Sequence, residues 1–195
     1  MSRFIETVLI KEGNARNLAY HQNRINRTIG KFFGTRPFNL GQALLHSPKA
    51  GTYRCRLTYA KIIEKIEFIP YTFTKKSKLL AIESDLNYNY KFYDRTHLDS
   101  LLEKAVGSGF DDALIVKNGL VTDTTIANIA FYDGTKWITP ALPLLRGTAR
   151  ARYLQSGMVT AENIPVETVG RFSHFALMNA LTGFYIAGLT QNIER

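Results

Sequence analysis

Lys91 stands out as a lysine set among aromatic side chains. It lies in the segment NYNYKFYDR, between Tyr90 and Phe92. Apolar surroundings lower the pKa of a lysine amine, and the neutral amine is a nucleophile that can form a Schiff base with a carbonyl compound. The alternative is that the aliphatic stem crosses an aromatic patch and carries the ammonium group to solvent. Lys91 is therefore a candidate for covalent chemistry, and its immediate neighbours alone do not decide between the two.

The segment LLRGTAR (Leu144–Arg150) has the composition of a phosphate-binding turn. Gly147 precedes small residues at the predicted start of a helix, where free backbone N–H groups and the positive end of the helix dipole favour an anion. Gly147 would permit a phosphate to approach the backbone closely, and the amides of Thr148 and Ala149 would donate hydrogen bonds to it. An ordinary loop-to-helix junction explains the same residues.

Two charged residues could complete such a site. Asp123, in VTDTTIAN, follows a predicted hairpin and lies at a strand end. A carboxylate there can pair with a protonated pyridine nitrogen, although Asp123 and Thr125 could equally cap a turn. Arg24, in HQNR, projects from the first predicted helix and could bind a phosphate. Its alternative is a solvated helix face.

These residues must be positioned by a mixed α+β chain with a hairpin-rich sheet. The patterns predict strands over Phe4–Lys11, Thr52–Tyr59, Ile62–Pro70, Lys78–Glu83, Ala113–Val116, Leu120–Thr122, Ile126–Tyr132 and Lys136–Thr139. They predict helices over Asn17–Phe33, part of Asn39–His46, His97–Ala105, Gly147–Gln155 and Phe175–Ile186. Asn118-Gly119 and Asp133-Gly134 each predict a two-residue hairpin turn, and Asp94 is expected to cap the His97–Ala105 helix. A break near Ser84–Tyr90 separates a small N-terminal α/β lobe (1–85) from a larger lobe (86–195).

Composition narrows the class of protein. The 195 residues are 45% hydrophobic and 21% charged, as in ordinary folded proteins, and no stretch is long and apolar enough to span a membrane. The single cysteine, Cys55, fits a reducing cytoplasm. The net charge of +9 comes from scattered basic residues with no RNP-like or zinc-binding pattern, which favours a small anionic substrate over nucleic acid. We expect a cytoplasmic protein with no metal site.

Taken in order, the motifs resemble the class IV aminotransferase and 4-amino-4-deoxychorismate lyase family. FIETVLIKEGNARNLAYHQNRINRT resembles its strand–turn–helix opening, and KFYDR resembles the lyase branch. VTDTTIANIAF, WITPALPLLRGTAR and MNALTGFYIAGL resemble its later segments. The resemblance covers nearly the whole chain, and the ordered set is more specific than any one motif.

The resemblance implies a two-lobed fold and pyridoxal 5′-phosphate (PLP) as cofactor, with Lys91 as the Schiff-base lysine and general base. It implies cofactor-binding roles for Arg24, Lys91, Asp123, Gly147, Thr148, Ala149, Asn179 and Ala180. It aligns Arg95 with an arginine that follows the lysine by four residues in the lyase branch, which makes Arg95 a candidate substrate-binding residue. It aligns Thr7 with a threonine that passes a proton to the departing pyruvate carbon. It also implies a homodimer, because sites of the family are completed at a subunit interface.

Three departures from the family pattern bear on the site. Asp123 stands where glutamate is usual and is one methylene shorter. The glycine-rich segment that precedes FIET in typical members is absent, and residues 33–53 are abbreviated. Ala149 lacks the hydroxyl that some transaminases carry at this position, so only its amide could bind phosphate.

The resemblance leaves two reactions open. The first is the conversion of 4-amino-4-deoxychorismate to 4-aminobenzoate and pyruvate in folate biosynthesis, which Thr7 favours; the second is transamination of D- or branched-chain amino acids. Arg54 and Arg56 share one face of a strand and could bind substrate carboxylates, with Arg56 preferred, or could pair with Glu64 or Glu67. A non-catalytic homologue that binds anionic ligands is the alternative of another class.

Overall fold

The computed structural model describes residues 2–195, which divide into two compact units. The first unit comprises residues 2–73 and Tyr90–Asp94, and the second comprises Thr74–Asn89 and Arg95–Arg195. The expected boundary at 85/86 differs from this division, because residues 74–85 group with the second unit and the segment containing Lys91 returns to the first.

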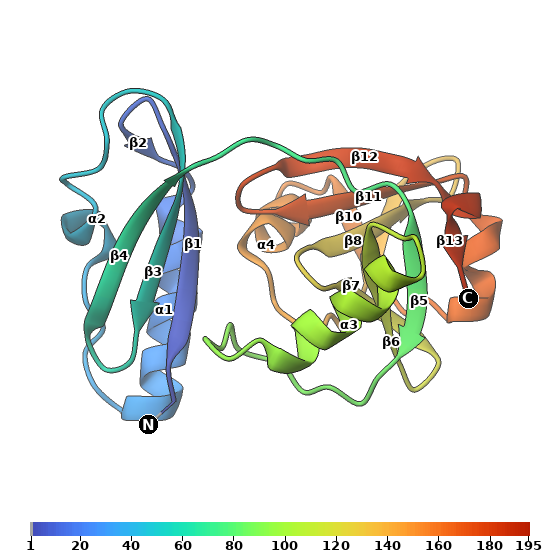
Figure 1. Cartoon of the computed structure of the whole chain (residues 1–195), viewed down its shortest axis with the longest axis horizontal. Helices are drawn as coiled ribbons and strands as arrows, with labels where there is room; N and C mark the ends of the chain where they lie inside the picture. The colour runs from blue at the N-terminus through green and yellow to red at the C-terminus, as the bar shows by residue number, and fades with distance from the viewer. Residues whose placement is uncertain (1) are drawn as a thin grey trace. The chain divides into compact units, whose positions relative to one another are not determined.

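The first unit is a four-stranded sheet with a long helix on one face (Figure 1). Its elements are β1 (Phe4–Lys11), β2 (Asn14–Ala15), α1 (Leu18–Phe33), α2 (Leu40–Ala43), β3 (Thr52–Tyr59) and β4 (Ile63–Pro70). The strand order is β2-β1-β3-β4, and every pairing is antiparallel. These elements confirm the strands and helices predicted for residues 4–70, with shifts of a few residues at their ends.

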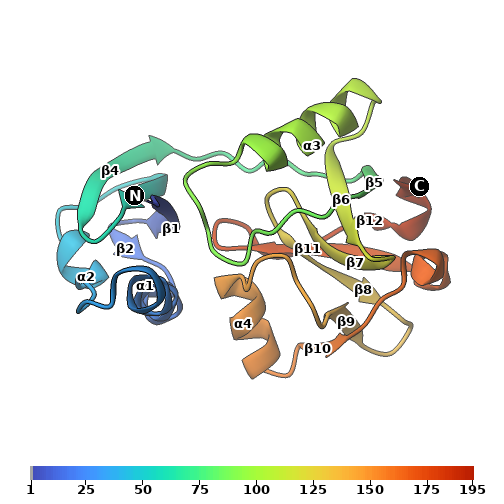
Figure 2. The same ribbon diagram turned by 90° about the horizontal axis from the view of Figure 1, so that it is seen from below.

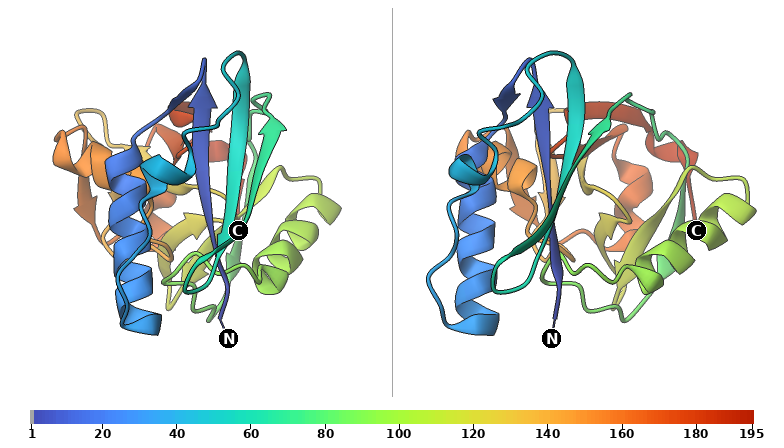
Figure 3. Two further views of the ribbon diagram at one scale, coloured as in Figure 1. Left: turned by 90° about the vertical axis from the view of Figure 1, so that its left-hand side faces the viewer. Right: turned by 60° about the vertical axis from the view of Figure 1, so that its left-hand side comes forward.

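Helix α1 covers the sheet because its apolar residues recur at helical spacing. Ile25 and Ile29 are fully buried and pack against Phe4 and Val8 of β1 and Leu57 of β3. Figure 3 shows α1 running beside the strands of this unit. Alternate residues of β1 therefore face α1, and the residues between them lie on the opposite face of the sheet.

The second unit is a larger, mixed sheet with two helices. Its elements are β5 (Leu79–Glu83), α3 (Thr96–Gly107), β6 (Asp112–Lys117), β7 (Leu120–Thr124), β8 (Asn128–Tyr132), β9 (Trp137–Pro140), α4 (Thr148–Gln155), β10 (Val159–Glu162), β11 (His174–Asn179), β12 (Gly183–Leu189) and β13 (Ile193–Glu194), with 3₁₀ helices at Val166–Arg171 and Thr190–Asn192. The order is β10-β9-β8-β7-β6-β5-β13, and the β11–β12 hairpin joins through β8. This is the α+β class expected from the sequence.

The helices of the second unit cover different parts of its sheet (Figure 2). Residues near the end of α3 pack with Ile82 of β5 and Ala113 of β6, whereas α4 packs with Ala130 of β8 and Met178 of β11. The largest core of the unit is lined by β8 and β11 residues such as Phe131. Strand β8 is thus buried on both faces, which explains its nearly continuous apolar run.

Three local predictions for this unit are wrong. Phe175–Ile186 is not a helix but the β11–β12 hairpin, because both strands pair within the sheet and β11 is buried on both faces. Asp133-Gly134 is not a two-residue turn: Tyr132 pairs with Trp137, so four residues connect the strands, and the Asp133 carboxylate accepts hydrogen bonds from the Thr135 and Lys136 amides. Asp94 does not take the N-cap position of α3, which belongs to Arg95.

The Asn118-Gly119 turn is confirmed. Both residues have positive φ, 52° and 72°, as a two-residue hairpin of the expected type requires. Among residues 2–195, no helix has both the length and the apolarity that crossing a lipid bilayer demands.

Candidate functional site

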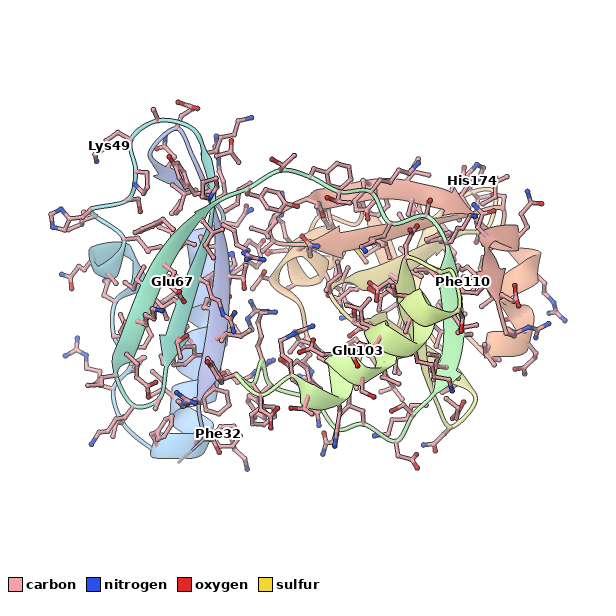
Figure 4. The ribbon with its side chains drawn as sticks, viewed as in Figure 1. Phe32, Lys49, Glu67, Glu103, Phe110 and His174 are labelled. Carbon is pink, nitrogen blue, oxygen red and sulfur yellow. The ribbon has the colours of Figure 1, made fainter. Side chains whose placement is uncertain are left out.

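The Lys91 segment extends the edge of the first unit's sheet. The Lys91 carbonyl accepts a hydrogen bond from the Ile5 amide at 2.9 Å, and Phe92 pairs with Phe4 across an antiparallel bridge. The Phe92 ring lies 5.2 Å from the Phe4 ring, on the α1 side, and the Tyr90 ring contacts Phe32, which Figure 4 labels. Alternation therefore places Lys91 on the face away from α1.

This placement changes the reason why Lys91 could be reactive. The sequence suggested that Tyr90 and Phe92 surround the Lys91 amine, but their rings pack toward α1 while the half-buried Lys91 side chain lies on the other face. The rings of Tyr90 and Phe92 therefore do not desolvate the Lys91 amine. Instead, Lys91 has polar neighbours on the same face of the sheet.

Thr7, Arg54 and Arg56 lie on the same face as Lys91. In the β1–β3 register Thr7 is directly opposite Arg56, and Leu9 is opposite Arg54. The Arg56 guanidinium lies 5.5 Å from the ring of Tyr93, which shares this face because it alternates with Phe92. The structure thus brings together, on one sheet face, the lysine, the threonine and the two arginines identified from the sequence.

Glu67 of β4 is an acidic residue of this face. Figure 4 labels Glu67, which is directly opposite Arg56 in the β3–β4 register, as was considered from the sequence. Its carboxylate, however, forms an ion pair with Lys65 at 2.8 Å. The Lys65 hydrogen bond lowers the pKa of Glu67, with smaller contributions from Arg56 and Arg54. Glu67 therefore remains an anion and leaves the face with a basic balance.

Arg24 belongs to a buried charge cluster on the α1 side of this sheet. Its Nε donates to Glu6 Oε2 at 3.0 Å, its Nη2 also bonds Glu6, and His21 Nδ1 lies 2.7 Å from Glu6 Oε1. Glu6 is fully buried, and Arg24 and His21 are nearly so, which excludes the solvated helix face considered for Arg24. Any phosphate held by Arg24 would bind a guanidinium that Glu6 already orients.

The charge cluster keeps Glu6 ionised. Burial by itself would raise the pKa of Glu6, but the positive charge of Arg24 and the hydrogen bond from His21 more than offset it, lowering the pKa from 4.5 to about 2. Glu6 and His21 were not identified from the sequence. The signal available was a glutamate on the same strand face as Phe4 and Val8, where a charge needs a partner.

Asp123 in the second unit is a buried carboxylate with hydrogen bonds to both oxygens. Its Oδ1 accepts from Asn128 Nδ2 at 2.6 Å, and its Oδ2 accepts from the Leu145 amide at 2.7 Å. Burial raises the pKa of Asp123 to about 7, which these hydrogen bonds and the charge of Arg150 only partly oppose. Because Leu145 is far away in sequence, Asp123 links two segments and is not simply a cap of its own turn.

Gly147 is explained by the close approach of Asn128. A Cβ added at Gly147 would lie 1.9 Å from Asn128 Oδ1, which no side chain could tolerate. Asn128 also donates to the Leu145 carbonyl at 2.8 Å. The same asparagine thus holds the Asp123 carboxylate and the segment that begins α4.

The start of α4 has the features of an anion-binding turn. Gly147 occupies the N-cap position in an extended conformation and no side chain caps the helix, so the first-turn amides of Thr148 and Ala149 have no intrahelical acceptor. Ala149 packs with Met178, the residue before Asn179. The Asn179 side-chain oxygen accepts from the Leu181 and Thr182 amides, which makes Ala180 part of a turn ordered by Asn179.

Arg95 does not lie on the face with Lys91; it belongs to the second unit. Its Nη2 donates to the Thr125 carbonyl at 3.0 Å, and its Nε lies 3.4 Å from Asp99. Thr125 in turn donates through its amide and hydroxyl to the buried Asp112. Arg95 thus supports the loop after Asp123, and a substrate-binding role for it stays a prediction.

The second unit fits PLP at both ends of the cofactor. The uncapped amides at the start of α4 suit a phosphate, and the buried Asp123 carboxylate suits a pyridinium. Burial raises the pKa of Asp123 more than its hydrogen bonds lower it, and a protonated ring nitrogen beside the carboxylate would add a positive charge that favours the ionised form. Asn128, Leu145 and Gly147 connect the two ends through hydrogen bonds and close packing.

Comparisons with known proteins identify the family of this chain. The family model described as amino-transferase class IV matches residues 47–187. An uncharacterized protein of Haemophilus influenzae is 32% identical over 194 residues, which cover 94% of this chain and 100% of the relative. The crystal structure of a candidate 4-amino-4-deoxychorismate lyase from Haemophilus somnus 129PT is also 32% identical, covering 94% of this chain and 98% of that chain, with a TM-score of 0.84.

A more distant structure shares the fold alone. A hypothetical aminotransferase from Mycobacterium tuberculosis, solved in a PLP-bound form, has a TM-score of 0.78 at 16% identity, covering 95% of this chain and 80% of that chain. The family model and the two 32% identical relatives each span most of the chain. The protein therefore belongs to the class IV aminotransferases, a family of PLP-dependent aminotransferases and lyases.

Proposed function

We propose that this enzyme uses PLP to convert 4-amino-4-deoxychorismate into 4-aminobenzoate and pyruvate. The observation that carries the proposal is the position of Thr7. It shares a sheet face with Lys91 and is directly opposite Arg56, so a hydroxyl, an amine and a guanidinium are presented together. The candidate lyase from Haemophilus somnus, similar along almost its whole length, supports the same reaction.

Lys91 and Thr7 would carry out the two proton transfers of this reaction. PLP, when bound through Lys91, supplies an electron sink for the substrate ring. Lys91, whose amine would be freed when the substrate amine takes its place on the cofactor, would remove a ring proton as general base. The bond from the ring to the enolpyruvyl oxygen would break, and Thr7 would deliver a proton to the methylene carbon of the departing group. The proton lost by the ring equals the proton gained by pyruvate, so the reaction balances without an oxidant or a second substrate.

The charged residues would bind and orient the substrate and the cofactor. The substrate carries two carboxylates, and Arg56 and Arg54 offer two guanidinium groups on the face that carries Lys91. Arg24, the α4 amides and the Ala180 amide would bind the cofactor phosphate, and Asp123 would keep the ring nitrogen protonated. In Asp123→Asn the shape is kept and the charge lost, so PLP should still bind while turnover falls by orders of magnitude.

The test compares the two reactions on one preparation. Purified enzyme with PLP is given 4-amino-4-deoxychorismate, and 4-aminobenzoate and pyruvate are quantified; in parallel it is given D- and L-amino acids with 2-oxoglutarate. Equimolar 4-aminobenzoate and pyruvate are expected. Transamination of amino acids with no 4-aminobenzoate would overturn the proposal in favour of an aminotransferase.

Thr7→Val isolates the residue that carries the proposal. Valine keeps the β-branched shape and removes the hydroxyl, so lyase turnover should fall by about 10²-fold, as expected for loss of a general acid, while PLP affinity is unchanged. Thr52→Val, at the far end of β3, is the matched control and should retain full turnover. If Thr7→Val and Thr52→Val behave alike, Thr7 is not the proton donor.

A further inference from the structure

Asn128, the first residue of β8, lies where three segments of the second unit meet. Its side chain is 5% exposed. Its Nδ2 contacts Asp123 Oδ1 at 2.6 Å and the Leu145 carbonyl at 2.8 Å, and its Oδ1 occupies the space that a Cβ at Gly147 would need. One side chain thus touches the end of β7, the loop before α4 and the N-cap of α4.

The orientation of the Asn128 amide follows from its neighbours. A carboxylate oxygen and a backbone carbonyl are both acceptors, so only the NH₂ group can face them, and its two hydrogens match these two acceptors. The carbonyl oxygen must then point toward Gly147. Because Gly147 has φ of −67°, an ordinary value, its lack of a side chain is required by this contact and not by backbone conformation.

We propose that Asn128 is a positioning residue that holds Asp123 and the start of α4 in one fixed arrangement, so that the ring-nitrogen and phosphate ends of the cofactor are gripped together. This inference rests on the proposed cofactor roles of Asp123 and the α4 amides. The Leu145 amide completes the arrangement by bonding the second oxygen of Asp123. Neither oxygen of the carboxylate can rotate away without breaking a buried hydrogen bond.

The arrangement also controls the charge of Asp123. Burial raises the pKa of this carboxylate to about 7, and the Asn128 hydrogen bond is one of the contacts that oppose the rise. Without that donor the ionised form would lose a charge-assisted hydrogen bond inside the protein. Asp123 would then be protonated over more of the neutral pH range and would bind a pyridinium less well.

The first experiment follows the titration of Asp123 in cofactor-free protein. Carboxyl-¹³C aspartate is incorporated, and the Asp123 resonance is identified by its loss in Asp123→Asn. In Asn128→Ala the titration midpoint should rise above that of the wild type. In Asn128→Asp, which keeps the shape, two adjacent carboxylates should titrate in separated steps, the upper at least about one pH unit above the wild-type midpoint. Unchanged midpoints in both variants would overturn the proposal.

The second experiment is a double-mutant cycle. Gly147→Ala in the wild type places a methyl group against Asn128 and should lower both the thermal midpoint and the affinity for PLP. In the Asn128→Ala background the obstructing oxygen is gone, so the same Gly147→Ala change should cost much less. Additive effects of the two changes would show that Asn128 and Gly147 do not act as a unit.

PLP binding itself supplies the third readout. Asn128→Ala should raise the PLP dissociation constant by about 10-fold or more, the loss of affinity expected when one hydrogen bond to a charged group is removed. An unchanged dissociation constant would also contradict the proposal. If the wild type binds no PLP at all, the proposed function fails, whereas the titration and the thermal cycle still report on Asn128. The two failures are therefore distinguishable.

Discussion

Replacing Glu6 by glutamine tests the buried charge cluster of the first unit. Glu6 is fully buried between Arg24 and His21, and its pKa is lowered from 4.5 to about 2. A shift of this size corresponds to about 3 kcal/mol of folding free energy at neutral pH. Because the pKa in the folded protein lies below the unfolded value, this stabilisation is present above about pH 4.5 and is lost as the pH falls toward 2.

The assay is urea unfolding followed by far-UV circular dichroism at pH 5 and pH 3. The wild type should lose about 2 kcal/mol over this interval from Glu6 alone, since most of the folded protein still has Glu6 ionised at pH 3 and the unfolded chain does not. Glu6→Gln should lack this component. It should also be less stable than the wild type at pH 5, because the buried guanidinium of Arg24 loses its counter-charge.

Glu103→Gln is the matched control. Glu103 is an exposed carboxylate on α3 (Figure 4), so the same change removes a charge without touching a buried cluster. Its pH dependence should follow that of the wild type. If Glu6→Gln and the wild type instead lose equal stability between pH 5 and pH 3, Glu6 is not held ionised by Arg24 and His21, and the reasoning is refuted.

Three further outcomes are expected. Borohydride reduction of the PLP-loaded protein and peptide mapping should place the pyridoxyl group on Lys91; an adduct on another lysine would contradict the assignment. Ala149→Pro should weaken PLP binding far more than Ala149→Gly, measured by equilibrium titration, because proline removes the amide donor and glycine keeps it; equal affinities would exclude that amide. The PLP-loaded protein is proposed to be a homodimer, and sedimentation at micromolar concentration should give twice the mass of the chain; a monomer would disprove it.

The parts of the fold that the sequence predicted well are those fixed by local patterns. The period of α1 and the Asn118-Gly119 turn each depend on residues close together in the chain, and both are confirmed. Phe175–Ile186 failed because a run of buried Phe, Ala, Leu and Met is compatible with either a helix or a fully buried strand. Only its pairing with β8 and with the strand that follows decides.

The candidate site shows the same division. Thr7 and Arg56 were each identifiable by type and position, but their direct opposition follows from a register between strands about 50 residues apart. Arg24 was identified without its partner, since Glu6 lies 18 residues away on another element. Asn128 lies within the motif VTDTTIAN, but the sequence indicated no role for it, because its contact with Gly147 exists only once β8 and α4 are packed.

The segment Tyr90–Asp94 has a consequence for how the protein is made. Residues 2–73 emerge from the ribosome before the second unit, but the segment of residues 90–94 that pairs with β1, and with it Lys91, is made only after the chain has begun the second unit. The two units are consequently joined by three covalent crossings, after Phe73, Asn89 and Asp94. After a single proteolytic cut between residues 74 and 89, residues 90–94 of the C-terminal fragment would still pair with β1 of the N-terminal fragment. The two fragments should therefore remain associated until the protein is denatured.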